Sequence, residues 1–343
     1  MNLAIHHRKG SFSDKWIEYC KKNNYNYSLV NCFDNNIVHI VEDHDAILWN
    51  FEIGTPQESI FAKDILISLE YKGIKVFPNV NTCWHYDNKI AQKYLLESIC
   101  DFTIPTYIFY DLPEAQSWIN ETTFPKVFKL SKGAGSSNVQ LVQSKKQALK
   151  LAKKAFSFGF SHYGLFKDSS NRIQKHQKNR DYYQVIKRLP NTVFNIYKYK
   201  LATGREKNYI YFQDFIPDNH YDTRVTVIGK RAFAFRRFVR NNDFRASGSG
   251  KIDYSTDDIN RDCLKIAFQI AERLKTQSIA CDFVQNCNGE QKLIEVSYSF
   301  DPYCVYNCPG YWSPTDLDWH PCHTWPQDAI IEDLIDSIQN KHQ

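Results

Sequence analysis

The sequence predicts an α/β protein of two or three contacting domains, with more α+β character in its C-terminal half. Three observations predict this fold class: the length of 343 residues, an early alternation of strand-like and helix-like runs, and later strand-like runs around one long helix. A chain of this length exceeds one ordinary hydrophobic core. Because 43% of the residues are apolar and 15% are aromatic, we expect an ordered chain without long disordered tails.

Residues 1–86 alternate between strand-like and helix-like runs. The strand-like runs are 2–6, 28–32, 46–49 and 75–78, and the helix-like runs are 14–23 and 59–72. Apolar residues recur at helical spacing in the second helix, and Gly73 supplies its C-terminal stop. Strands that alternate with helices pair in parallel, so this segment is interpreted as a small parallel α/β scaffold domain.

A second unit begins at residue 87 and a third near residue 212. The later helix-like runs are 89–100, 147–156, 258–275 and an amphipathic one at 330–338. The later strand-like runs are 104–110, 125–130, 138–142, 209–216, 223–228, 231–238, 279–286 and 291–297. The polar stretch 131–137 joins two of these strands and predicts a hairpin tip.

Positive charge is concentrated in one segment of the chain. From Lys150 to Lys207 the sequence has fourteen Lys or Arg residues against three acidic ones, within a formal net charge of +5. Residues 157–207 have no clear period, so they are interpreted as a basic insert. Interleaved Tyr and Phe leave nucleic-acid binding as a weaker alternative, because an anionic small molecule, a polysaccharide or ATP phosphates explain the same charge.

Several protein classes are excluded. The stretch SGSGK at 247–251 is not a phosphate loop, because Arg245 stands where the first glycine of GxxxxGK[ST] belongs, and no GxGxxG follows an N-terminal strand. The N-terminus lacks a signal-peptide pattern, and no run approaches the roughly 18 apolar residues of a membrane span. Ten cysteines without a secretory signal indicate reduced thiols, so we expect a cytoplasmic protein.

A spaced set of short motifs runs through residues 87–297. Its members are DNK at 87–89, PKVFK at 125–129, SKGAGSS at 131–137, FQDFI at 212–216, YDTR at 221–224, DFRAS at 243–247, CDF at 281–283 and IEVS at 294–297. In this order and spacing the set resembles the ATP-grasp superfamily, most closely its RimK-like carboxylate–amine ligase branch, over roughly residues 87–300.

The resemblance implies an ATP-grasp fold with an N-terminal Rossmann-like domain and two β-rich subdomains that enclose ATP. The expected domains are 1–86, then 87–211 with the basic insert 157–207, and then 212–343 with the C-terminal tail. Its cofactors would be ATP and Mg²⁺, with Mn²⁺ as a substitute.

The triphosphate needs positive charge and backbone donors. By resemblance, Lys129 would contact the α and β phosphates and Lys89 would assist, whereas the alternative for either is a solvated surface lysine. The tip offers backbone N–H groups and hydroxyls on a flexible loop, among them Gly133, Gly135 and Ser136. Its alternative is an ordinary solvent-exposed hairpin.

The resemblance places the base and the ribose on the next two motifs. Gln213, Asp214 and Phe215 match the connector whose backbone reads the adenine edge, although the family usually has Glu where Asp214 stands. Asp222 aligns with the acid that binds the ribose hydroxyls, and its alternative is a turn or capping aspartate.

Asp282 and Glu295 lie in two strand-like runs joined by an Asn-Gly turn, which brings carboxylates side by side. Carboxylate and phosphate oxygens form the environment that Mg²⁺ prefers, whereas the alternative is a pair of structural salt-bridge acids. The family's third ligand is normally an Asn where this chain has Ser297, so a second metal ion stays open.

Arginines match the family's remaining charged positions. Arg237 and Arg245 would reach the transferring phosphate and the acyl phosphate, a task that suits a rigid guanidinium fork. Ser247 would contact the substrate. Arg224 is interpreted as an internal ion-pair partner, and Arg236 would point to the other face of its strand.

The tail contains cysteines and histidines at 304, 308, 320, 322 and 323, among aromatic residues. Zinc binding is conceivable, but the spacing is not a recognised ligand pattern, and reduced cysteines are commonly core residues. The tail is therefore expected to pack beside the acceptor pocket.

Together these motifs predict an ATP-dependent ligase that forms an amide bond through an acyl phosphate. Its expected partners are a small-molecule or saccharide carboxylate, such as a uronic acid or an amino acid, and an amine; a homo-oligomer stays open. The alternatives are a phosphotransferase that uses a hydroxyl acceptor and an ATP-binding protein without turnover.

Overall fold

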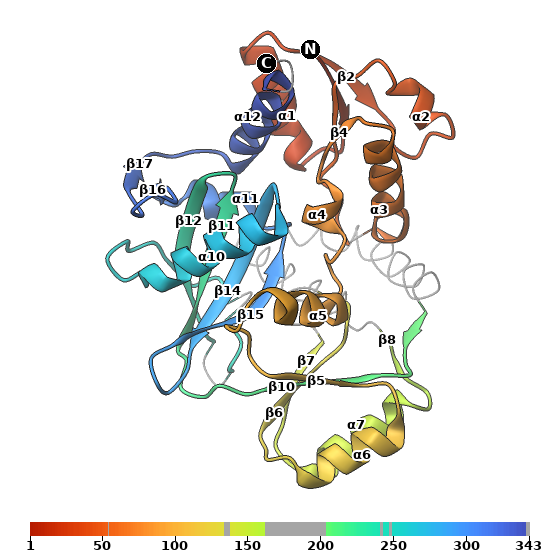
Figure 1. Ribbon diagram of the computed structural model, residues 1–343, viewed down its shortest axis with the longest axis vertical. Coiled ribbons are helices and arrows are strands. Elements are labelled where there is room, and N and C mark those ends of the chain that lie inside the picture. Colours follow the sequence, from red (N-terminus) through yellow and green to blue (C-terminus); the bar gives the residue numbers. More distant parts are fainter. Residues whose placement is uncertain (54, 134–137, 162–203, 241–242, 247–248, 341–343) are drawn as a thin grey trace, which may run out of the picture.

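The computed structural model describes residues 1–53, 55–133, 138–161, 204–240, 243–246 and 249–340 (Figure 1). Three main sheets and a two-stranded ribbon are present in this part of the chain. Among its helices none is long and apolar enough to cross a membrane.

The N-terminal sheet is parallel, with strand order β2-β1-β3-β4. Its elements are β1 (Asn2–His6), α1 (Phe12–Lys22), β2 (Asn26–Val30), α2 (Ile37–Ile40), β3 (Ala46–Leu48), α3 (Pro56–Tyr71), β4 (Lys75–Phe77) and α4 (Val80–Cys83). The Ser11 side chain caps α1 by accepting from the Ser13 amide, and Trp16 lies fully buried on its inner face. The predicted parallel α/β arrangement is therefore confirmed.

The second sheet is antiparallel, with strand order β5-β10-β6-β7. Its elements are α5 (Lys89–Ile99), β5 (Thr106–Phe109), α6 (Leu112–Glu121), β6 (Lys126–Lys129), β7 (Val139–Val142), α7 (Lys145–Ala155) and β10 (Ile210–Asp214). Helices α6 and α7 pack on one face around a core that includes Ile119, Phe128 and Phe212 (Figure 1). The opposite face is left for the cavity described below.

The third sheet has seven strands and order β15-β14-β11-β12-β16-β17, with β13 on β12. Its elements are β11 (Tyr221–Ile228), β12 (Arg231–Phe238), β13 (Ile252–Asp253), α10 (Arg261–Leu274), β14 (Ser278–Gln285), β15 (Gln291–Ser297), α11 (Pro302–Tyr306), β16 (Gly310–Trp312), β17 (Trp319–Pro321) and α12 (Pro326–Gln339). Helix α10 covers one face of this sheet through Leu264 and Ile270.

The other face of the seven-stranded sheet shares a hydrophobic core with the N-terminal sheet. Phe233 and Phe235 of β12 belong to the same buried cluster as Ile5, Trp16 and the apolar residues of α12. Helix α12 packs against α1, so the C-terminal helix closes the core of the N-terminal unit (Figure 1). The division at residues 86 and 211 stays a prediction.

The basic insert is described only near its ends. Strand β8 (Phe160–Ser161) and strand β9 (Arg205–Glu206) form an antiparallel ribbon that flanks it. The remainder of the insert, residues 162–203, lies outside the described residues.

Candidate functional site

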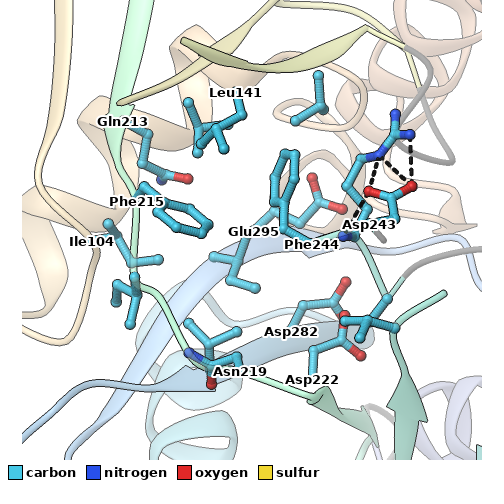
Figure 2. Close-up of a pocket in the computed structure, with 18 of the residues that line it drawn as sticks. Ile104, Leu141, Gln213, Phe215, Asn219, Asp222, Asp243, Phe244, Asp282 and Glu295 are labelled. Carbon is cyan, nitrogen blue, oxygen red and sulfur yellow. Dashed lines mark hydrogen bonds and ion pairs between the residues drawn. The ribbon is translucent and has the colours of Figure 1, made fainter. Parts of the chain in front are cut away.

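A cavity of about 900 Å³ opens between the second, antiparallel sheet (β5-β10-β6-β7) and the seven-stranded sheet (Figure 2). Apolar side chains, among them Ile104, Leu141 and Phe215, gather on one side of it, and the acids Asp222 and Asp282 lie on the other. Ten of the predicted site residues line this cavity: Lys89, Lys129, Gly133, Gln213, Asp214, Phe215, Asp222, Arg245, Asp282 and Glu295.

Strand alternation explains which side chains the second, antiparallel sheet presents to the cavity. Successive side chains point to opposite faces, so Val127 and Lys129 of β6 and Gln213 of β10 share the cavity side. The side chains of Lys126 and Asp214 point to the opposite side, where the Lys126 Nζ is 2.6 Å from an Asp214 carboxylate oxygen, so Asp214 lines the cavity through its other atoms. Lys126 thus pairs with the Asp214 carboxylate, and recognition of a base by the backbone of this connector stays a prediction.

Lys129 is the buried cation of this wall. Its Nζ donates to the Gln213 Oε1 at 2.6 Å, and the Gln213 Nε2 donates to the Thr106 Oγ1 at 3.1 Å. Burial lowers the pKa of Lys129 to about 8; nearby Glu295 opposes this shift and the positive charge of Lys89 adds to it. The ammonium is therefore protonated near neutral pH but lacks a full counter-charge, which suits it to an anionic ligand.

The connector after β10 forms the apolar part of the cavity. Phe215 meets Phe244 edge-on, with ring centroids 5.7 Å apart (Figure 2). Ile104 and Ile294 also line this part. Apolar walls of this kind suit a planar heterocyclic base.

The wall from the seven-stranded sheet is charged. Alternation places Asp222 and Arg224 of β11 on one face, and the strand register adds Arg237 of β12, Asp282 of β14 and Glu295 of β15. Asp282 and Glu295 are register partners across the β14–β15 pair, as the Asn-Gly turn predicts.

Two arginines and two aspartates of this face form one network, which is buried except for the partly exposed Arg224. The Arg237 Nε and Nη2 donate to the two Asp222 oxygens at 2.7 and 2.6 Å, and the Arg237 Nη2 also contacts the Asp282 Oδ2 at 2.7 Å. The Arg224 Nε and Nη2 donate to Asp282 Oδ1 and Oδ2, both at 2.7 Å. The predicted ion-pair role of Arg224 is thereby confirmed.

The pKa values of the two carboxyls in this network are shifted in opposite directions. Burial alone would raise the pKa of Asp282, but the charges and hydrogen bonds of Arg224 and Arg237 hold it well below its usual range. Burial raises the pKa of Asp222; the charge and hydrogen bonds of Arg237 oppose this rise, and the like charge of Asp282 adds to it. Asp282 therefore stays ionised across the physiological range.

The donor set fits a hard divalent cation. An ionised carboxylate has about four acceptor positions. In Asp282 the Oδ2 accepts two guanidinium bonds and the Oδ1 one, so the Oδ1 keeps a free lone pair. Among the described residues Glu295 has no hydrogen-bond or ion-pair partner. Glu295 and the Asp282 Oδ1 would thus hold Mg²⁺, together with phosphate oxygens.

Ser297 does not join this donor set. Its Oγ donates to the Ser299 carbonyl at 2.8 Å, and it is not among the cavity-lining side chains. Within the described ranges no group of three or more His, Cys, Asp or Glu residues could hold a metal ion. This finding covers the tail as well, where the Cys322 Sγ contacts the Thr324 Oγ1 at 3.2 Å and His320 contacts Ser313.

The two predicted catalytic arginines occupy different places. Arg245 lines the cavity, where its Nε and Nη2 donate to Asp243 at 2.9 and 2.7 Å (Figure 2). Arg237 lies beneath the cavity wall in the network with the acids, with 7% of its surface exposed. Its contact with a phosphate stays a prediction. Ser247 lies outside the described residues.

The glycine-containing tip is described as far as Gly133, which has a φ of +112°, a conformation that favours glycine. The Lys89 Nζ donates to the Gly133 carbonyl at 2.8 Å, and both residues line the cavity. Gly135 and Ser136 lie outside the described residues.

Three contributors to the site were not predicted from the sequence. Phe244 covers Phe215, and its position between Asp243 and Arg245 in the DFRAS motif was the available signal. Asp87 and Glu206 bind amides of the tip; Asp87 opens the DNK motif, and Glu206 is a rare acid in the basic segment.

No protein-family model matches the chain, and no curated protein sequence matches it. Solved structures do match over almost the whole chain. The RimK domain ATP-grasp protein from Sphaerobacter thermophilus has a TM-score of 0.57 at 15% identity, covering 98% of this chain and 99% of that one. The chain has the ATP-grasp fold.

Two further solved structures match the chain over a similar extent. The D-cycloserine synthetase DcsG has a TM-score of 0.58 at 12% identity, covering 97% of this chain and 100% of that one. The D-alanine–D-alanine ligase from Bacillus anthracis, complexed with ATP, has a TM-score of 0.54 at 13% identity, covering 99% of both chains. The fold that the motif order implied is confirmed, and the cavity lies between the two β-rich sheets of this ATP-grasp fold.

Proposed function

We propose that the protein is an ATP-dependent carboxylate–amine ligase that forms an amide through an acyl phosphate and releases ADP and phosphate. The observation that supports this is the division of the cavity. An apolar side beside the connector suits the base, and on the charged side buried Lys129 faces the register partners Asp282 and Glu295. The similar D-alanine–D-alanine ligase structure is itself complexed with ATP.

In this proposal the chain's own residues divide the work. Lys129, supported by Lys89, offsets charge on the triphosphate, and Arg245 offsets charge on the transferring group. A substrate carboxylate oxygen attacks the γ-phosphorus and ADP leaves; the amine nitrogen then attacks the acyl carbon, loses a proton and expels phosphate. When bound at Glu295 and Asp282, Mg²⁺ neutralises charge on the phosphate oxygens.

The finer parts of the proposal concern substrate and setting. We propose a small-molecule or saccharide carboxylate, a uronic acid or an amino acid, and a cytoplasmic location. Mn²⁺ would substitute for Mg²⁺, because it accepts the same oxygen ligands.

One observation favours a second candidate, an ATP-binding protein without turnover. The Ser297 hydroxyl is engaged by the Ser299 carbonyl, and only two carboxylates face the cation position among the residues described here. A site with fewer ligands binds the cation more weakly, which would favour nucleotide binding over phosphoryl transfer.

The test measures ADP and free phosphate released from Mg-ATP with a panel of uronates, nucleotide-linked uronic acids and amino acids, each with a pool of amines. A ligase releases equal ADP and phosphate only when both a carboxylate and an amine are present. In Glu295→Gln this release should fall on the order of a hundredfold or more. Phosphate retained on an acceptor hydroxyl would identify a phosphotransferase, and nucleotide binding without release would identify the second candidate.

A further inference from the structure

Carboxylates accept hydrogen bonds from three consecutive backbone amides at the start of the glycine-containing tip. The Ser131 and Lys132 amides donate to the Glu206 Oε2 and Oε1 at 2.8 and 3.1 Å. The Gly133 amide donates to the Asp87 Oδ1 at 2.7 Å. Successive N–H groups that converge on anionic oxygens form a nest, the same arrangement that binds phosphate in other proteins.

The same short segment is held by neighbouring groups on two sides. On one side, the Lys89 amide donates to the Ser131 carbonyl at 3.0 Å, and the Ser131 Oγ donates to the Asn88 Oδ1 at 3.1 Å. On the other side, the Tyr209 hydroxyl donates to Glu206 and accepts from the Ser131 amide at 2.7 Å. Residues 131–133, the first three residues of the tip, are therefore held in place from both sides.

Glu206 comes from the ribbon that flanks the basic insert. The Arg205 side chain donates to the carbonyls of Phe158 and Gly159, the latter at 3.0 Å, and the Asn208 amide donates to the Ala155 carbonyl at 3.1 Å. The ribbon is thus attached to the end of α7. This attachment determines where the Glu206 carboxylate lies relative to the tip.

Phosphate would be a poor replacement for these carboxylates. Hydrogen bonds from amides to ionised oxygens are about twice as strong as neutral ones. Displacing Asp87 would remove its hydrogen bond from the Gly133 amide, which lowers the pKa of this partly buried carboxyl against the rise that burial causes. An incoming phosphate would also lie beside two like charges.

We propose that Glu206 is a positioning residue for the nucleotide site: together with Asp87 it holds the amides of residues 131–133 whether or not nucleotide is bound, and so directs Gly133 and Lys89 toward the cavity. This inference rests on the proposed function only in taking the ligand to be ATP. Glu206 touches no reacting atom, so its removal weakens nucleotide affinity and leaves the chemical step unchanged.

The test combines hydrogen exchange of the peptide containing residues 130–133 with Mg-ADP titration. Glu206→Ala is compared with the isosteric Glu206→Gln, and Glu121→Gln serves as a control for loss of an exposed acid. Arg205→Gln removes the ribbon's contacts to the carbonyls of Phe158 and Gly159 but keeps the Glu206 carboxylate. Wild type should protect these amides equally with and without Mg-ADP.

In Glu206→Ala exchange at Ser131 and Lys132 should accelerate about tenfold, and the Kd for Mg-ADP should rise about tenfold. The exchange rate and the Kd for Mg-ADP of Glu206→Gln should lie between those of Glu206→Ala and wild type. If the alanine variant does not fold, the glutamine variant serves as the test. Glu121→Gln should keep the affinity of wild type, whereas Arg205→Gln, which loosens the ribbon that carries Glu206, should weaken it less than Glu206→Ala does. With a confirmed substrate pair, KM for ATP should rise while kcat at saturating ATP stays unchanged.

Three results would overturn the inference. Unchanged exchange and affinity would show that Glu206 does not hold the tip, and tighter Mg-ADP binding in Glu206→Ala would show that the carboxylate competes with phosphate. A lower kcat with unchanged affinity would place Glu206 in the chemistry. Exchange and Mg-ADP binding require no turnover, so a protein that ligates nothing still tests this inference separately from the proposed function.

Discussion

Nucleotide affinity should depend on pH because Lys129 is a buried base. Its ammonium donates to the Gln213 amide oxygen rather than to a carboxylate, and burial lowers its pKa to about 8. A bound triphosphate adds negative charge near the ammonium and raises that pKa. Above pH 8, therefore, the protein must take up a proton in order to bind nucleotide tightly.

The size of the effect follows from the pKa. The protonated fraction of a group with a pKa near 8 falls from about nine-tenths at pH 7 to about one-tenth at pH 9. If the pKa in the complex lies well above this range, the association constant for nucleotide falls about tenfold over the same interval. The logarithm of that constant should approach a slope of minus one per pH unit.

Isothermal titration with Mg-ADP at saturating Mg²⁺ measures this directly. Titrations in two buffers of different ionisation enthalpy, from pH 7 to 9.5, give the number of protons taken up. The matched control is Lys129→Arg, whose guanidinium stays protonated and should show a flat pH profile whatever its absolute affinity. A flat profile in wild type, or the same slope in Lys129→Arg, would refute the assignment of the proton to Lys129.

Stability should change with pH in the opposite direction. The folded-state pKa of Lys129 lies below its value in the unfolded chain, so between about pH 8 and 10 the unfolded state binds more protons. The contribution of Lys129 to the free energy of unfolding therefore rises with pH. Lys129→Met should be more stable than wild type at pH 7, by at most about 3 kcal/mol, and this difference should shrink by pH 10 in urea denaturation.

Three further substitutions test other parts of the structure. Arg224→Met leaves the Asp282 carboxylate with Arg237 alone, so the free energy of unfolding in urea should fall by about 3–5 kcal/mol; a loss below 1 kcal/mol would contradict the network. Asp214→Asn breaks the pair with Lys126 on the far side of the sheet, so thermal stability should fall while Mg-ADP affinity stays unchanged; weaker binding would show that the carboxylate itself reads the ligand. Gly310→Ala places a Cβ against the His320 carbonyl and the Trp319 ring, and should lower the free energy of unfolding by roughly 1–3 kcal/mol; an unchanged denaturation midpoint would mean that the hairpin shifts freely.

Strong local patterns explain which elements were predictable. Strands β1, β12 and β15 begin and end where their alternation predicts, and β15 follows the Asn-Gly turn. Helix α6 was missed because its ten residues are partly polar and directly follow a strand, although Asp111 caps it and Pro113 lies in its first turn. Strands β16 and β17 were missed because three aromatic-rich residues are too few to show a period.

The residue types of the site were predictable from the sequence, but the contacts between these residues were less so. Motif order brought ten of the predicted residues to one cavity, and alternation explains why Lys129 and Gln213 share a face. The pairing of Arg237 with both Asp222 and Asp282 depends on the register of three strands. That register cannot be deduced from the pattern of a single sequence. The contact of Glu206 with the tip also spans the insert, which no local pattern can reveal.

The charge balance of this face determines which acid is the better probe of chemistry. The formal charges of one largely buried set of side chains cancel: Arg224, Arg237, Asp222 and Asp282. Replacing any one of them leaves a buried charge uncompensated, so the variant loses stability before its chemistry can be judged. The Glu295 carboxylate has no such partner among the described residues, so Glu295→Gln breaks no ion pair or hydrogen bond, although it removes a negative charge that raises the pKa of Lys129. A loss of activity in Glu295→Gln with unchanged unfolding would therefore report on the site itself, whereas the same loss in Asp282→Asn would not.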